Sequence, residues 1–392
     1  MEILFLTYFN IMKKYFIFAA AAIVAASCAK TPAPVQTPDN DFTAPSVEGK
    51  VAVQFGSNVI ANVDTKAPIT STNFQGTRVR VYGAQRTSDG HIWQNNKLFI
   101  KNVEAEVETA GKLKLENTPG VPFYYAGNNT YDFYGYYDGT PSPDPVFEDA
   151  TNSYNLDVTI DGTQDIILAT ADPAYAVTTS GQTAVADQLG TDWNDRFAFS
   201  AYAARRKVHP ILQFKHLLTQ LNFKVSSGTE TFDENTKLYV TGLTINQANS
   251  TAKFRVAGES DLGLSSMATP ENLAVKKDDS TPLNNANSVE VPNSAGEAQV
   301  LGQMMLFPGA SFEVTLTLAK KNPETPEATE TVTRTITPSM IDPSYTEFEA
   351  GKSYTFTFKV YGLEAVNITA ELEEWQNAGE YVIDTDDKPT VY

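Results

Sequence analysis

The chain has 392 residues, of which 47 are acidic and 29 basic, and its formal net charge at pH 7 is -18. This acidic balance, with no stripe rich in lysine and arginine, argues against nucleic acid as a partner and favours a soluble, secreted surface. The only cysteine is Cys28, so a disulfide bond within the chain is excluded.

The N-terminal residues have the pattern of a bacterial export signal. Lys13 and Lys14 precede an apolar run at residues 15–26, which is shorter than the roughly 20 residues that span a bilayer. The run ends in Ala-Ala-Ser before Cys28, which resembles the lipobox of lipoproteins, where the cysteine is acylated. We therefore expect a signal peptide at 1–27, a palmitate-type lipid on Cys28 and a proline-rich tether at 28–45. An ordinary signal peptide that happens to end near a cysteine is the alternative.

The first half of the remaining chain alternates apolar and polar residues with a period of two, which predicts half-buried β-strands. The clearest examples are residues 51–55, 79–82, 131–136 and 156–160. Turn residues such as Asn, Asp and Gly separate these runs.

The second half repeats the alternation at residues 221–225, 238–240, 312–318 and 354–360. Helical spacing is confined to residues 208–220, and the polar stretch 258–298 predicts long loops. The pattern therefore predicts an all-β protein of antiparallel β-sandwiches.

The folded part of the chain is longer than a single hydrophobic core usually supports. This predicts two tandem β-sandwich domains, at 46–205 and 206–392. The basic cluster at residues 205–207 marks the expected boundary, although a charged hairpin would have the same pattern.

No motif points to an enzyme, a metal site or a cofactor. The three histidines, His91, His209 and His216, lack the spacing of metal ligands, and no phosphate-binding loop or nucleophile elbow is present. A pair of carboxylates for glycoside hydrolysis, brought together from distant strands, is the enzymatic alternative that the sequence leaves open.

Several segments, in their order and spacing, resemble the fimbrillin family, which comprises the subunits and associated lipoproteins of type V pili. The resemblance covers most of the mature chain. Members of the family carry a lipobox, a tether and two transthyretin-like β-sandwich domains. The segments that carry it are Tyr131–Tyr137, Asp165–Ala169, Phe214–Phe223, Phe307–Gly309, Phe348–Phe356 and Ile368–Trp375.

The resemblance implies assembly by donor-strand exchange. A lipidated precursor reaches the outer membrane, a trypsin-like protease cuts after a basic residue, and the first strand leaves with its lipid. A strand from a neighbouring subunit then takes its place by β-augmentation. Val51, Val53 and Phe55 form the candidate first strand in this sequence.

The expected processing site is the bond between Lys66 and Ala67, where the family often has Arg-Ala. Lys66 departs from that pattern and Pro68 follows closely, so a protease strict for arginine would leave the site uncut. Arg78 is the next basic candidate, but it opens an apparent strand. The plain alternative for Lys66 is an ordinary loop lysine.

The donor strand implied by the resemblance lies at the C-terminus, where Tyr381 and Ile383 alternate with polar or smaller residues. The expected partners are other pilus subunits, and the outer membrane through the lipid. If the last strand completes the second domain instead, the chain suits a tip or an anchor. The rival hypothesis is a permanently anchored surface lipoprotein that binds a glycan or a host or bacterial surface ligand through exposed aromatics such as Trp93 or Trp375.

Overall fold

The computed structural model describes most of the chain between residues 51 and 374. The described residues are 51–55, 74–86, 97–108, 113–119, 121–126, 129–139, 143–181, 183, 199–206, 208–228, 237–259, 261–277, 281–294, 296–322, 325–362 and 366–374. They belong to one compact unit, Thr43–Tyr392. None of the described helices has the length and apolar character needed to cross a membrane.

The largest sheet has six strands in the order β10-β9-β6-β1-β2-β3, and all its neighbours are antiparallel. Its central strands are buried along almost their whole length because both faces of the sheet are covered. The strands are β1 (Arg78–Gln85), β2 (Leu98–Val107), β3 (Leu113–Lys114), β6 (Tyr131–Tyr137), β9 (Ile167–Thr170) and β10 (Lys215–His216).

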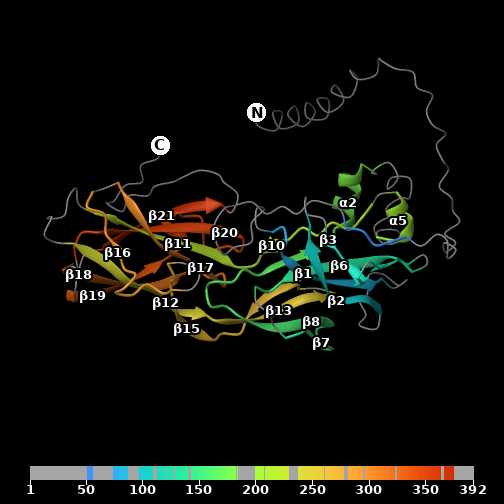
Figure 1. Ribbon diagram of the computed structural model, residues 1–392, viewed down its shortest axis with the longest axis horizontal. Coiled ribbons are helices and arrows are strands. Elements are labelled where there is room, and N and C mark those ends of the chain that lie inside the picture. The colour runs from blue at the N-terminus through green and yellow to red at the C-terminus, as the bar shows by residue number, and fades with distance from the viewer. Residues whose placement is uncertain are drawn as a thin grey trace, which may run out of the picture. The chain divides into compact units, whose positions relative to one another are not determined.

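A four-stranded antiparallel sheet covers one face of the six-stranded sheet (Figure 1). The core between them is aromatic, with Tyr82 and Tyr136 facing Tyr154 and Phe254. The order is β14-β13-β8-β7, with β14 (Gly263–Ser266), β13 (Thr251–Gly258), β8 (Ser153–Thr159) and β7 (Val146–Glu148). A separate two-stranded sheet pairs β4 (Glu116–Thr118) with β5 (Val121–Pro122).

The opposite face of the six-stranded sheet is covered by two short helices and by irregular chain. The helices are α2 (Pro173–Ser180) and α5 (Ala201–Arg205), and the side chains of Asp172 and Ser200 cap their N-termini. Gly135 in β6 is required here, because a Cβ atom on it would lie 2.7 Å from Leu212 Cδ1.

A second sandwich lies in the C-terminal half of the chain. Its sheets have the orders β17-β11-β20-β21 and β15-β12-β18-β19, with β16 paired to β12. Aliphatic and aromatic side chains from both sheets fill one core. The strands are β11 (Thr219–Ser227), β12 (Leu238–Asn249), β15 (Pro270–Ala274), β16 (Val289–Glu290), β17 (Ala298–Leu306), β18 (Phe312–Asn322), β19 (Thr325–Ile336), β20 (Lys352–Val360) and β21 (Val366–Glu374), with the 3-10 helix η4 (Pro338–Met340).

The predicted fold class is confirmed, since the described residues form two-layer packings of mainly antiparallel strands. One detail differs from the expected antiparallel pattern: β11 and β20 are parallel, with Leu221 opposite Tyr354 and Phe223 opposite Phe356. The side chains of these four residues are fully buried.

The sheets join residues from both sides of position 205. Strands β13 and β14, which follow this position, complete the sheet of β7 and β8, which precede it. Strand β10 likewise pairs with β9. The division into domains at 46–205 and 206–392 stays a prediction, and any such division has to assign residues 251–266 to the N-terminal sandwich.

Two local predictions were wrong. The stretch 208–220, expected to contain a helical turn, is extended and includes β10, whereas the helices lie at α2 and α5. The stretch 258–298, expected to consist of loops, contains the short strands β14, β15 and β16.

Candidate functional site

Residues 51–55, here called the first segment, lie against residues 123–125 at the face of the six-stranded sheet that carries the helices. The backbone pairing is antiparallel and centres on Ala52 and Tyr124. The Val53 N–H donates to the Phe123 carbonyl at 2.8 Å, and the Tyr125 N–H donates to the Val51 carbonyl at 3.0 Å. The first segment is therefore bound as an added strand at the edge of residues 121–126.

The side chains of the first segment alternate between the core and the solvent. Val53 and Phe55 are 4% and 7% exposed, whereas Gln54 between them is exposed. The Phe55 ring meets the Phe133 ring edge to face, with 5.4 Å between centroids. Burying two large apolar side chains of this kind stabilises the bound segment by about 1.5–3 kcal/mol each, which exceeds what two backbone hydrogen bonds contribute.

The surface that receives the first segment is mainly aromatic. Phe133 of β6 lies at its centre, 6.4 Å from Tyr125 and 5.9 Å from Phe199 between ring centroids. Tyr131 lies 4.4 Å from Phe99 of β2. Rigid rings of this size accept an apolar side chain with little loss of conformational freedom, which suits a site that binds alternate side chains of a strand.

Two tyrosines of this surface differ in their hydroxyl groups. The Tyr131 hydroxyl contacts the backbone of Ala126. The Tyr125 hydroxyl is buried without a hydrogen-bond partner among the described residues. Burial raises the pKa of Tyr125 well above its ordinary value, so this side chain is neutral and acts as an apolar wall.

The sequence did not reveal the strand that receives the first segment. Residues 121–125 read Val-Pro-Phe-Tyr-Tyr, and Pro122 interrupts the alternation that would predict a strand. The signal that was available is the pair of aromatic residues Phe123 and Tyr125. They are two positions apart in the sequence, as Val51 and Val53 are, which is the spacing of side chains on one face of a strand.

The remaining predicted site residues fall into two groups. Arg78 begins β1, a central strand, where it lies opposite Glu106 of β2 and its guanidinium contacts Glu104 at 2.7 Å. The others lie outside the described residues, and they are Cys28, Lys66, Ala67, Trp93, Trp375, Tyr381 and Ile383.

Two of the three histidines lie in described parts of the chain. His216 Nδ1 lies 2.8 Å from Asp165 Oδ2, which ties β10 to the residues before β9. His209 is partly buried, and burial lowers the pKa of its imidazole. Within the described ranges, no group of three or more His, Cys, Asp or Glu side chains is placed to hold a metal ion.

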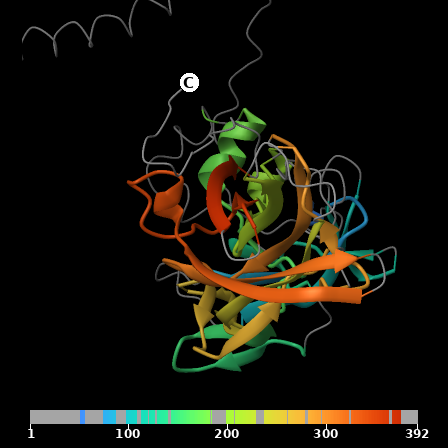
Figure 2. The ribbon, with the colours of Figure 1, turned by 90° about the vertical axis from the view of Figure 1, so that its left-hand side faces the viewer.

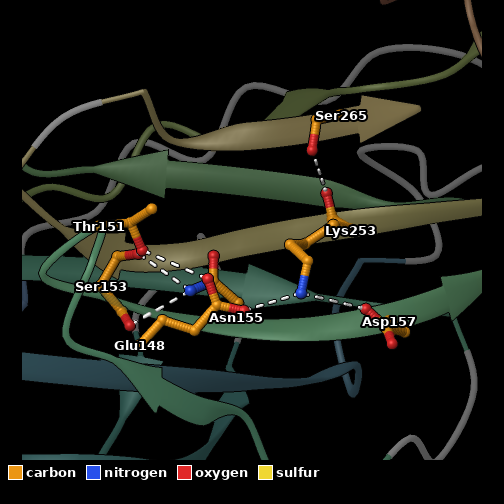
Figure 3. A network of polar contacts seen from close by, with 7 residues as sticks. All are labelled: Glu148, Thr151, Ser153, Asn155, Asp157, Lys253 and Ser265. Carbon is orange, nitrogen blue, oxygen red and sulfur yellow. Dashed lines mark hydrogen bonds and ion pairs between the residues drawn. The ribbon is translucent and has the colours of Figure 1, made fainter. Parts of the chain in front are cut away.

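A polar network lies on the outer face of the β7, β8, β13 and β14 sheet (Figure 3). Lys253 of β13 contacts Glu148 at 2.8 Å and Asp157 at 3.6 Å. The hydrogen bond from Lys253 lowers the pKa of Glu148. The contacts join strands from both halves of the chain, so the network serves to hold this sheet together.

These features define a class of protein, namely an all-β protein whose first segment occupies a strand-binding site. The model of the family described as "Fimbrillin-like" matches residues 65–375. The chain therefore belongs to the fimbrillin-like family, whose resemblance the sequence motifs had indicated. No curated protein sequence matches it.

The chain is also similar to solved structures of proteins from Bacteroides and Porphyromonas species. A fimbrial protein from Bacteroides vulgatus is 14% identical, with a TM-score of 0.50 over 82% of this chain and 99% of that one. A putative cell adhesion protein from Bacteroides uniformis is 15% identical, with a TM-score of 0.48 over 84% and 100%. The fimbrial anchor protein Mfa2 from Porphyromonas gingivalis is 13% identical, with a TM-score of 0.35 over 83% and 97%.

Membership of the fimbrillin-like family makes this a structural protein and not an enzyme. It supports a role in a pilus or in cell adhesion.

Proposed function

We propose that the chain is an exported lipoprotein subunit of a bacterial surface pilus, lipidated at Cys28 and assembled by donor-strand exchange. Proteolysis between Lys66 and Ala67 removes the first segment with its lipid, and a strand from a neighbouring subunit binds in its place. The observation that carries this proposal is the binding of the first segment as an added strand, through two backbone hydrogen bonds and the buried Val53 and Phe55.

The sheet topology agrees with removal of the first segment. All six strands of the largest sheet are paired with one another without it. Its loss uncovers an edge at residues 123–125 and an aromatic surface, and such an edge pairs readily with an incoming strand. Keeping the edge covered until proteolysis prevents premature association of the precursor.

Lys66 is favoured over Arg78 as the processing residue. Cleavage after Arg78 would cut at the start of β1, which is hydrogen-bonded to β2 and β6 on its two sides. Lys66 lies between the first segment and β1 in the sequence, so cleavage there separates the segment from the rest of the fold.

The donor strand is proposed to come from the C-terminal residues that include Tyr381 and Ile383. Strand β21, which ends at Glu374, already pairs with β20 along its full length. The proposed donor residues follow this strand in the sequence. Tyr381 and Ile383 have the same spacing of two as Val53 and Phe55, and so present side chains to one face of a strand.

The test is to treat the purified precursor with a trypsin-like protease and to follow the N-terminal sequence and the formation of oligomers. We expect a new N-terminus at Ala67 and an oligomer ladder that survives mild denaturation. Lys66→Gln should abolish both, and Lys66→Arg should preserve both as a matched control.

A second measurement separates this function from the rival. If the mature surface form retains an acylated Cys28 and no cleavage at Lys66 is found, strand exchange is refuted and the anchored, ligand-binding lipoprotein is supported.

A further inference from the structure

Strand β19 forms a long open edge of the C-terminal sandwich. Eleven of its twelve residues pair with β18 on one side, from Ile336 opposite Phe312 to Thr325 opposite Asn322. No strand among the described residues pairs with its other side. Figure 2 shows β18 and β19 as two long orange strands that run side by side.

Residues 328–336 of this edge lack the features that usually prevent strands from pairing with other chains. Such features are proline, lysine, bulges and short length. Here Pro326 and a bulge at Glu327, which lies opposite the Lys320–Lys321 step of β18, are at one end of the pairing, and Pro338 follows the other end. Between them, residues 328–336 pair in regular register and contain neither proline nor lysine.

The other sheet edges are better protected. Strands β3, β7, β10 and β14 have two, three, two and four residues. Strand β15 begins with Pro270, and the bridge between Lys276 and Gln303 covers part of β17. Strand β21 carries three glutamates among its last four residues. Strand β19 is therefore the longest edge strand of the described sheets, with twelve residues against nine in β17 and β21.

The sequence of this edge is complementary to itself. Residues 329–335 read Thr-Glu-Thr-Val-Thr-Arg-Thr, with Val332 at the centre. If two copies pair antiparallel about Val332, Glu330 of each lies opposite Arg334 of the other, and threonine lies opposite threonine at every odd position. Opposite charges and threonine pairs are both favourable across antiparallel strands.

Backbone geometry permits this register. Because it places odd-numbered residues opposite odd-numbered ones, the N–H and carbonyl groups that point outward from one edge meet outward-pointing groups on the other. The side chains that would face the second copy are accessible, since Glu330 and Arg334 are exposed. Arg334 Nη1 donates to the Thr333 carbonyl of its own strand at 2.9 Å, so the guanidinium already lies along the backbone.

We propose that β19 is an interface between two copies of this chain, which pair antiparallel about a two-fold axis through Val332. A contact of this kind is isologous and closes after two copies. It is independent of the proposed strand exchange, which uses the first segment and a site in the N-terminal sandwich. In a pilus it would join subunits of neighbouring filaments side by side.

The test uses the unprocessed chain carrying Cys28→Ser, so that neither lipid nor strand exchange contributes, and measures self-association by sedimentation. We expect a reversible dimer. Glu330→Arg places arginines face to face, and Arg334→Glu places glutamates face to face. Each should weaken the dimer by about tenfold or more, since two attractive pairs become repulsive.

Restored complementarity is the matched control. The double variant Glu330→Arg/Arg334→Glu should dimerise like the parent chain, and an equimolar mixture of the two single variants should form a mixed dimer. Circular dichroism of each variant confirms that the exposed substitutions leave the fold intact.

Cross-linking tests the register independently. Chains with Thr331→Cys and chains with Thr333→Cys should form a mixed disulfide efficiently, because these positions face each other at a distance that a disulfide spans. Each variant alone should cross-link poorly. The proposal is overturned if the parent chain stays monomeric, which leaves the edge to another partner, or if the single charge reversals dimerise as well as the parent.

Discussion

Replacing Phe55 with alanine should release the first segment while the rest of the protein stays folded. The Phe55 ring is 7% exposed and packs edge to face on Phe133. In a fixed core, removing such a ring costs about 3–5 kcal/mol. The first segment can leave its site instead, so the cost is limited to the free energy that the side chain gives to binding. We expect a loss of about 2–3 kcal/mol in the docking equilibrium.

Hydrogen exchange measures this loss directly. The Val53 and Tyr125 amides are the two donors that join the first segment to residues 123–125. Their exchange should accelerate on the order of 30- to 150-fold, because each 1.4 kcal/mol corresponds to about a tenfold change. Amides in β1 and β6 should keep their protection. Cleavage by trypsin after Lys66 should be faster than in the parent chain.

Gln54→Ala provides the matched control, since Gln54 lies between the two buried side chains but is exposed. It should change exchange by less than about threefold, as expected for a surface substitution. If Phe55→Ala and Gln54→Ala give the same exchange rates at Val53 and Tyr125, the buried ring does not hold the first segment in its site.

Two further predictions concern buried charge. Burial lowers the pKa of His209 below 6.5, so on acidification the unfolded chain takes up a proton that the folded chain resists. The free energy of unfolding should therefore fall as the pH drops below 6.5. His209→Asn should remove this part of the pH dependence in urea titrations from about pH 7.5 to about pH 5.5. Equal slopes of unfolding free energy against pH in the parent and the variant would contradict this. Asp132→Ala should cost about 3 kcal/mol in denaturant unfolding, because it removes a charged partner of Arg86, whose side chain is 7% exposed. Glu104→Ala, which breaks the exposed pair with Arg78, should cost less than about 1 kcal/mol; similar losses for both variants would refute the role of burial.

The strands at the period-two segments could be predicted from the sequence, since each of these segments is buried on at least one face. The pairings could not. Lys253 and Glu148, which join β13 to β7, are 105 residues apart in sequence, and alternation contains no information about such partners. The binding of the first segment to residues 123–125 was missed for the same reason.

The two errors in local structure also have physical causes. Val208, Ile211 and Leu212 have the spacing of a helix face, but the chain here is extended. These three residues pack in the core on the helix-covered face of the six-stranded sheet, whereas Leu218 packs in the core on its other face. Strands β14 and β15 are mostly exposed edge strands, so their sequences lack the apolar alternation that marks a strand with one buried face.

The place of β13 in the fold has a consequence for how the chain matures. A polypeptide leaves the ribosome or an export channel from its N-terminus. Strands β7 and β8 therefore emerge long before β13, which lies between β8 and β14 in their sheet. Until residues 251–258 arrive, β8 presents an unpaired edge and the aromatic core around Tyr154 is open on one side. Contacts between such distant residues form slowly. The N-terminal sandwich is thus the first to be synthesised, yet it closes only when most of the chain has been delivered, which makes its assembly the step most exposed to aggregation.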